Sequence, residues 1–197
     1  MAVERGLLGR VAWLVSHLLN PAGLALLLFA GLTWLAQEAW LAGMAGAVLY
    51  SVMPGGILVW LRRSGYISEL YPVERSQRAG LLLLGTLCYF AGVAVLLLLE
   101  APIAMLIAGV AFACNTLLVW WINQYWKISI HAVGVSGAVS LLLLIGGASL
   151  WPALLALPLV AWARLHLRAH TVAQVAVGLL LGGISSALLC ALVLYDG

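Results

Sequence analysis

Charged side chains are scarce in this chain: they make up 8% of its 197 residues, whereas 65% of the residues are hydrophobic. Soluble chains carry about 25% charged residues, and a chain of this length cannot hide so much apolar surface in a single core. This shortage of charge excludes a soluble globular domain, and the apolar content excludes a disordered chain. Because basic residues are also few, the formal net charge of +3 bears on membrane orientation and does not indicate nucleic-acid binding.

Carboxylates and cysteines are equally sparse. The sequence has six acidic residues, and Asp196 is the single aspartate. Two-metal catalytic sites need several carboxylates, so metal-dependent lipid transferases are disfavoured, and we expect neither a metal nor a cofactor. The three cysteines, Cys88, Cys114 and Cys190, are too few for a disulfide scaffold and lie inside apolar runs, as packing residues do.

Long apolar runs are what the chain has in abundance. A helix that spans a bilayer needs roughly 20 apolar residues. We expect spans at residues 11–36, 39–61, 79–99, 102–122, 131–149, 150–164 and 170–194. The run 150–164 is the weakest, because it is short and contains Pro152 and Pro158. The sequence predicts an all-α polytopic transmembrane helix bundle of six to seven spans that forms one domain over residues 1–197.

The basic residues predict the orientation of this bundle. If the runs cross alternately, every Lys and Arg falls on the face of the N-terminus, and the other face carries Glu38, Glu100 and Asp196. The bases are Arg5, Arg10, Arg62, Arg63, Arg75, Arg78, Lys127, Arg164 and Arg168. By the positive-inside rule the basic face is cytoplasmic. The compact chain, which lacks targeting or glycosylation features, favours the cell inner membrane.

Three polar segments, residues 67–78, 126–131 and 163–174, adjoin helices on this basic face. An even number of crossings separates each pair, so the segments can converge on one site.

His131 and His170 each begin a predicted helix, and helix N-termini attract anions. Ionisable groups at a membrane edge are costly and indicate function. The nearby bases Arg75, Arg78, Lys127 and Arg164 make phosphate the expected anion.

In the last run a polar pair and two glycines recur every four residues, which places them on one helix face. They are His170, Gln174, Gly178 and Gly182. The glycines permit close contact with another helix, with the polar pair above them near the N-terminal end. Such a face serves packing within the chain or association of two chains, and the sequence leaves a homo-oligomer open.

These residues resemble the motifs of the type 2 phosphatidic acid phosphatase superfamily, which are integral-membrane lipid phosphatases. The segment Ser129-Ile130-His131 is similar to the end of the P-S-G-H motif of that family. Ala163-Arg164-x5-His170-x3-Gln174 is similar in spacing to its S-R-x5-H-x3-D motif. Glu74-Arg75-x2-Arg78 lies where the family has K-x6-R-P, without the lysine or the proline. The resemblance covers about residues 66–185.

The resemblance implies a metal-independent phosphatase that uses a phosphohistidine intermediate. His170 would attack phosphorus, and His131 would protonate the leaving oxygen and later help to activate water. Arg164, Arg75 and Arg78 would bind the equatorial oxygens, with Lys127 and Ser129 as further substrate ligands. The expected substrates are lipid monophosphates or diphosphates, such as phosphatidate, phosphatidylglycerol phosphate or a polyprenyl diphosphate.

Two departures from the family motifs bear directly on activity. Gln174 stands where the family has an aspartate that orients the nucleophile, and its carbonyl can accept the same hydrogen bond without bringing a charge. A weaker nucleophile is the expected result. Ala163 replaces a serine that would contact phosphate. The alternative function is therefore a non-catalytic or transport protein that binds an anionic lipid in a degenerate phosphatase site.

Each of these candidate site residues also has a purely structural interpretation. His131, His170 and Arg164 at helix ends are also consistent with capping, or with side chains that snorkel to lipid headgroups. Arg75, Arg78 and Lys127 are also consistent with topogenic charge. A bis-histidine haem or quinone protein is disfavoured, because its histidines would face each other deeper in the bundle.

Overall fold

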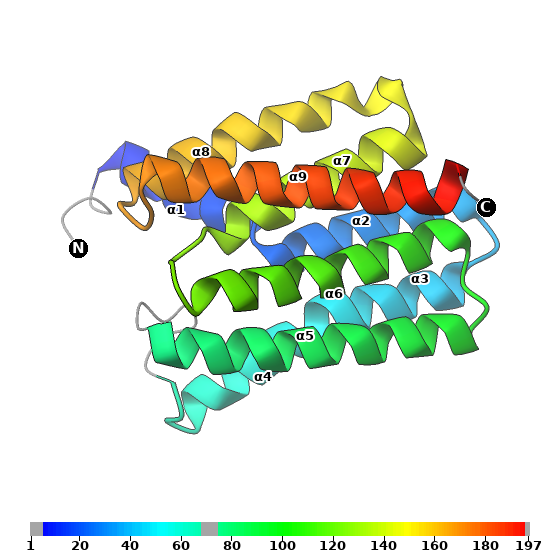
Figure 1. Ribbon diagram of the computed structural model, residues 1–197, viewed down its shortest axis with the longest axis horizontal. Coiled ribbons are helices and arrows are strands. Elements are labelled where there is room, and N and C mark those ends of the chain that lie inside the picture. The colour runs from blue at the N-terminus through cyan, green and yellow to red at the C-terminus, as the bar shows by residue number, and fades with distance from the viewer. Residues whose placement is uncertain (1–5, 68–74, 196–197) are drawn as a thin grey trace. The chain divides into compact units, whose positions relative to one another are not determined.

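A computed structural model describes residues 6–67 and 75–195, and over these residues the chain is helical and contains no strand. The prediction of an all-α protein is confirmed (Figure 1). The elements are α1 (Leu7–Leu18), α2 (Pro21–Ala36), α3 (Trp40–Ala47), the π-helical turn η2 (Val48–Val52), α4 (Met53–Arg63), α5 (Arg75–Leu98), α6 (Ile103–Asn123), α7 (Ile130–Gly146), the 3₁₀ segment η3 (Ala148–Leu155), α8 (Ala156–His166) and α9 (Val172–Tyr195).

The described residues contain five helical segments that are long and apolar enough to cross a bilayer, and the bent pair α1 and α2 makes a sixth. The five are Trp40–Arg63, Arg78–Leu98, Ile103–Asn123, Ala148–His166 and Val172–Leu194. The chain is thus an integral membrane protein, with five to six apolar spans in the part that the structure describes. The predicted run 150–164 is longer than expected, because η3 continues into α8. The run 131–149 is shorter, because α7 ends at Gly146.

The predicted span 11–36 is broken into two helices that meet at a bend of 54°. Pro21 is the first residue of α2, where its missing N–H costs nothing. Asn20 caps this helix, since its Oδ1 accepts a hydrogen bond from the Gly23 N–H at 2.7 Å. Its Nδ2 donates to the carbonyl of His17 at 2.6 Å, which satisfies an acceptor at the end of α1.

The chain divides into two compact units, Met1–Leu24 with Ile128–Gly197, and Ala25–Lys127. We call them the first and the second unit. The single domain predicted for residues 1–197 stays a prediction, and the predicted phosphatase-like core, about 66–185, takes residues from both units.

The second unit is organised around Tyr50. Its ring is fully buried and lies 5.0 Å from the ring of Phe29 and 5.1 Å from that of Tyr89, between centroids. Its hydroxyl donates a hydrogen bond to the carbonyl of Tyr89 at 2.9 Å. Tyr50 lies in η2, just before Pro54, whose lack of an N–H and whose ring disturb the α-helical pattern one turn earlier.

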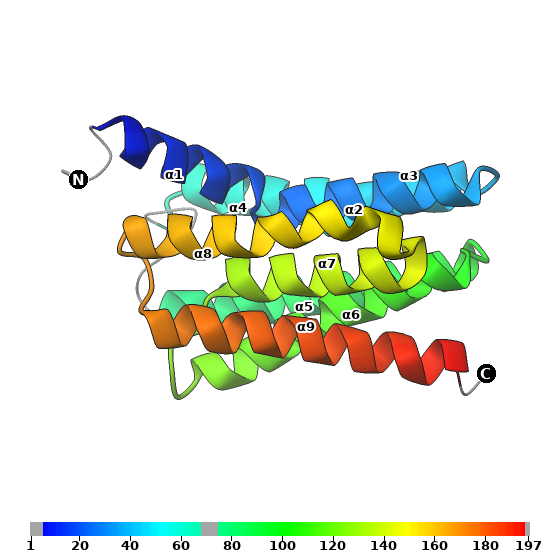
Figure 2. The same cartoon turned by 90° about the horizontal axis from the view of Figure 1, so that it is seen from above.

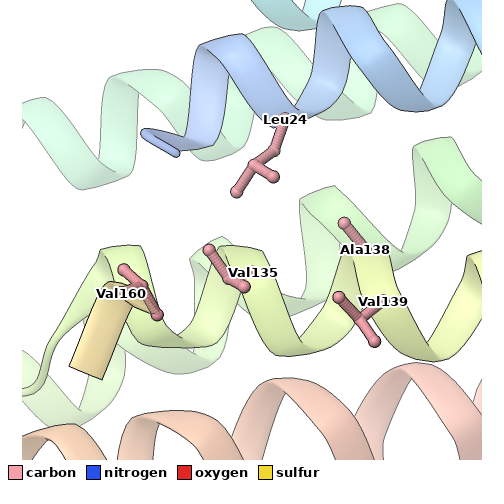
Figure 3. Close-up of a cluster of buried hydrophobic side chains, with 5 residues drawn as sticks. All are labelled: Leu24, Val135, Ala138, Val139 and Val160. Atoms are coloured by element: carbon pink, nitrogen blue, oxygen red, sulfur yellow. The ribbon is translucent and has the colours of Figure 1, made fainter. Parts of the chain in front are cut away.

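The first unit is built on α7, which packs against both α8 and α9. Helices α7 and α9 run in the same direction, and α8, which lies between them in the sequence, runs in the opposite direction (Figures 1 and 2). The start of α7, the end of α8 and the start of α9 therefore lie at one end of this unit. Figure 3 shows its apolar core, in which Leu24 of α2 and Val160 of α8 lie near the α7 side chains Val135, Ala138 and Val139.

Two glycines set the close approach of α9 to α7. A Cβ atom on Gly178 would lie 2.9 Å from both the Ala132 Cβ and the Ser129 carbonyl oxygen. One on Gly182 would collide with the carbonyl oxygen of Val133. This confirms the prediction that the glycine face of the last run serves close helix contact, and the contact described is within the chain.

Candidate functional site at the polar end of the first unit

The segment that carries His131 begins α7 and is linked to α9 by a backbone hydrogen bond. Ser129 is the N-cap of α7, and its Oγ accepts a hydrogen bond from the Ala132 N–H at 3.4 Å. Its own N–H donates to the carbonyl of Gln174 at 3.3 Å. His131 follows in the first turn of α7 with only 2% of its surface exposed. The structure thus brings the predicted Ser129–His131 segment to the first turn of α9, as the sequence predicted.

The capping role of Ser129 bears on its predicted function. This residue is buried, and its side-chain oxygen serves the backbone of α7. Its assignment as a substrate ligand stays a prediction.

A tight turn carries the chain from α8 to His170. The Ala169 N–H donates to the Arg164 carbonyl at 3.1 Å, and the Arg168 N–H donates to the Leu165 carbonyl at 2.9 Å. These bonds form a Schellman motif, with Arg168 in the left-handed position that usually holds glycine, at φ 52°. Arg164 in the last turn of α8 and His170 are therefore held at the same end of the unit.

The sequence placed His170 inside the last helix, but α9 begins at Val172 and His170 lies in the turn before it. The reason is a capping box formed by Thr171 and Gln174. The Gln174 N–H donates to Thr171 Oγ1 at 3.3 Å, and the Thr171 N–H donates to Gln174 Oε1 at 3.2 Å. The spacing Thr-x-x-Gln is a signal from which this boundary could have been predicted.

The same amide of Gln174 also contacts the ring of His170. Nδ1 of His170 lies 3.1 Å from Oε1 of Gln174. Because the Thr171 N–H can only donate, the Gln174 atom that faces it is the oxygen, and this fixes the orientation of the amide. An oxygen acceptor requires a proton on Nδ1 of His170, so a neutral ring has its lone pair on Nε2. Gln174 therefore makes the contact with His170 that its predicted orienting role requires, and the role itself stays a prediction.

Arg164 has a partner that sequence analysis missed. Its Nη1 donates a hydrogen bond to Oγ of Ser16 at 2.6 Å, across 148 positions of sequence. Ser16 lies in α1, which packs against α8. The only local signal was a face of small residues in α1, since Gly9, Ala12 and Ser16 are the buried residues of that helix.

The remaining predicted bases belong to the second unit. Arg78 is half-buried near the start of α5, and Lys127 is half-buried at the end of that unit. Arg75 begins α5, and its side chain lies outside what the structure describes. The participation of these three residues in the site stays a prediction.

Chemically, the predicted site residues at this end of the first unit bring together two helix N-termini, the guanidinium of Arg164 and the imidazoles of His131 and His170. A neutral His170 ring has its lone pair on Nε2. Helix N-termini and guanidinium groups both favour oxyanions. Over residues 6–67 and 75–195, no three His, Cys, Asp or Glu side chains lie together so that they could hold a metal ion. Comparisons of the chain with protein families, curated proteins and solved structures found no match.

Proposed function

We propose that this protein is a membrane-embedded lipid phosphatase that hydrolyses a lipid phosphomonoester or diphosphate through a phosphohistidine on His170. The orientation of His170 by Gln174 is the observation that carries the proposal, because it places the lone pair of a neutral ring on Nε2, the atom that would attack phosphorus. Support comes from His131 and Arg164, which two other helices bring to the same end of the unit.

In the first step, Nε2 of His170 attacks phosphorus and the bond from phosphorus to the lipid oxygen breaks. His131 donates a proton to that oxygen, which leaves as the lipid alcohol, or as the lipid monophosphate when the substrate is a diphosphate. Negative charge spreads over the equatorial oxygens in the transition state, where Arg164 stabilises it. Arg75 and Arg78 are the further bases proposed for this task, with Lys127.

In the second step, water attacks the phosphohistidine and the bond between phosphorus and Nε2 breaks. His131, now neutral, accepts a proton from the water and regains its starting state at the end of the cycle. Inorganic phosphate leaves. Gln174 Oε1 accepts a hydrogen bond from the Nδ1–H of His170 throughout, so the imidazole keeps its proton on Nδ1 through both steps.

The proposed substrate is a lipid with its phosphate at the cytoplasmic surface of the inner membrane and its tails in the bilayer. The basic residues Arg10, Arg164 and Arg168 of the first unit support this side by the positive-inside rule. An epitope on the N-terminus tests the orientation in spheroplasts. Protease should remove the epitope only after permeabilisation, and removal from intact spheroplasts would place the site on the outer face.

Phosphate release from purified protein tests the activity. In detergent with EDTA present, the protein should release inorganic phosphate from phosphatidate, phosphatidylglycerol phosphate or a polyprenyl diphosphate, and orthovanadate should inhibit this release. His170→Ala should lower the rate by at least 10³-fold, because the nucleophile is lost. Activity that survives this substitution would refute the mechanism.

His166→Ala is the matched control. It removes an imidazole from the last turn of α8, but this ring lies 5.5 Å from the ring of Trp162, between centroids, and has no proposed part in the reaction. Its rate should stay within about twofold of wild type.

The alternative function, an anionic-lipid binder without turnover, predicts a different result in the same preparation. Lipid phosphate would raise the thermal midpoint of unfolding, but mass spectrometry after long incubation would recover the lipid intact. Gln174 is the feature that favours this alternative, because an amide brings no charge to stabilise the imidazolium of the attacking histidine.

A further inference from the structure

Ser16 of α1 belongs to the polar end of the first unit, although it lies far from His131 and His170 in the sequence. Its Oγ accepts the 2.6 Å hydrogen bond from Arg164 Nη1, and only 2% of its surface is exposed. A charged donor and a short distance make this a strong hydrogen bond. It fixes a long side chain that would otherwise sample several rotamers.

The hydroxyl hydrogen of Ser16 has no acceptor among the residues that the structure describes, while its Oγ accepts from Arg164. A serine in a helix commonly donates to the carbonyl four residues earlier, as Ser136 does to Ala132 at 2.9 Å. A buried hydroxyl without an acceptor is costly. The side chain is thus poised to donate to a group that Arg164 also attracts.

Packing alone does not require this hydroxyl. The face of α1 that Ser16 shares has Gly9 and Ala12, which fill their positions without a polar atom. Alanine has nearly the size of serine and a higher helix propensity. The hydroxyl group at position 16 is therefore best explained by its hydrogen bond with Arg164 and by a ligand that Arg164 binds.

We propose that Ser16 positions Arg164 for the phosphoryl group and donates its own hydroxyl hydrogen to an oxygen of the same group. This inference rests on the proposed function. It extends the site to α1, the first described helix, outside the part of the chain that carries the family resemblance. The ligand chemistry is a phosphoryl oxyanion, in a lipid headgroup or as free orthophosphate.

The test compares Ser16→Ala, Ser16→Thr and Ser16→Val in the purified full chain. With short-chain phosphatidate, Ser16→Ala and Ser16→Val should lower kcat/KM by about tenfold or more, mainly through kcat, because the lost bonds act on the transition state. Ser16→Thr keeps the hydroxyl and should recover most of the activity. Valine matches threonine in shape, so this pair separates the hydroxyl from packing.

Two further variants control the measurement. Ser136→Ala removes a buried hydroxyl whose hydrogen bond stays within α7, and it should leave kcat/KM within about twofold of wild type. In an Arg164→Lys background, Ser16→Ala should cost much less than in wild type, because the two residues act as one unit. Thermal midpoints without ligand show that every variant compared is folded.

The outcomes separate this inference from the proposed function. The role of Ser16 is wrong if wild type is active and Ser16→Ala is equally active, or if Ser16→Thr is as impaired as Ser16→Val. Neither result contradicts the proposed phosphatase activity. A wild type that hydrolyses none of the lipids overturns the phosphatase. In that case orthophosphate should still raise the thermal midpoint of wild type and of Ser16→Thr but not of Ser16→Ala, and any other pattern overturns the role of Ser16 as well.

Discussion

Gln174 accepts a hydrogen bond from Nδ1 of His170 at 3.1 Å through the same oxygen that completes the capping box of α9. A residue that is needed to begin a helix thus also sets the tautomer of a histidine in the preceding turn. This double use explains why a glutamine is well suited to the position, because glutamine at the third helical residue is part of the capping box.

The charge at position 174 should set the rate of the first step. Gln174→Glu preserves the length of the side chain and the capping box, and it adds a negative charge beside the imidazolium that forms as His170 attacks. We expect kcat with phosphatidate to rise by up to about tenfold. A decrease in kcat, in a variant whose thermal midpoint equals that of wild type, would contradict the proposed role of Gln174.

Thr171→Ala separates capping from catalysis. It removes the Oγ1 acceptor of the Gln174 N–H but leaves the contact between Gln174 and His170. The free energy of unfolding should fall by about 1 kcal/mol, while kcat changes by less than about threefold. Gln174→Ala should lower both quantities. Equal losses of kcat in the two variants would show that helix capping alone explains the importance of this turn.

The close approach of α9 to α7 predicts a steep effect at Gly182. A Cβ there would collide with the Val133 backbone carbonyl, and a backbone atom cannot move aside alone. Gly182→Ala should lower the free energy of unfolding by about 1–3 kcal/mol, measured by thermal unfolding in detergent.

Gly183→Ala is the neighbouring control for this packing. Its Cβ would make only ordinary contact, with Ser140 Oγ at 3.6 Å. It should be neutral or slightly stabilising, since alanine is the better helix former. Equal effects of the two substitutions would contradict the account of the α7–α9 contact.

Arg168 holds a left-handed backbone conformation that glycine adopts without strain. Arg168→Gly should therefore be more stable than Arg168→Ala by about 1 kcal/mol. Both variants lose the same charge, so their difference in thermal unfolding reports on the backbone alone. Equal stability would mean that the turn between Arg164 and His170 does not require this conformation.

The sequence allowed the helical class and the membrane setting to be predicted, because apolar runs leave few alternatives in a bilayer. It also predicted that the polar segments 67–78, 126–131 and 163–174 converge on one site. The structure joins the last two, because the Ser129 N–H donates to the Gln174 carbonyl. The convergence of the first segment with them stays a prediction. The break at Asn20 and Pro21 was missed, although asparagine before proline is a recognisable start of a helix.

Other features depend on contacts that no local pattern reveals. The hydrogen bond between Ser16 and Arg164 joins α1 to α8, and single serines in apolar runs are usually packing residues. Likewise, the length of α7 depends on where the chain turns at Gly147, which has a φ of 91°. The apolar run itself continues past that point, so hydropathy alone extended the helix.

In the proposed reaction Nε2 of His170 carries the phosphoryl group between the two steps, and rapid quenching with ³²P-labelled short-chain phosphatidate would trap this intermediate. Wild-type protein should carry an acid-labile, alkali-stable label that mass spectrometry maps to Nε2 of His170, and His170→Ala should carry none. Release of phosphate without this label, or a label on another residue, would refute the phosphohistidine mechanism.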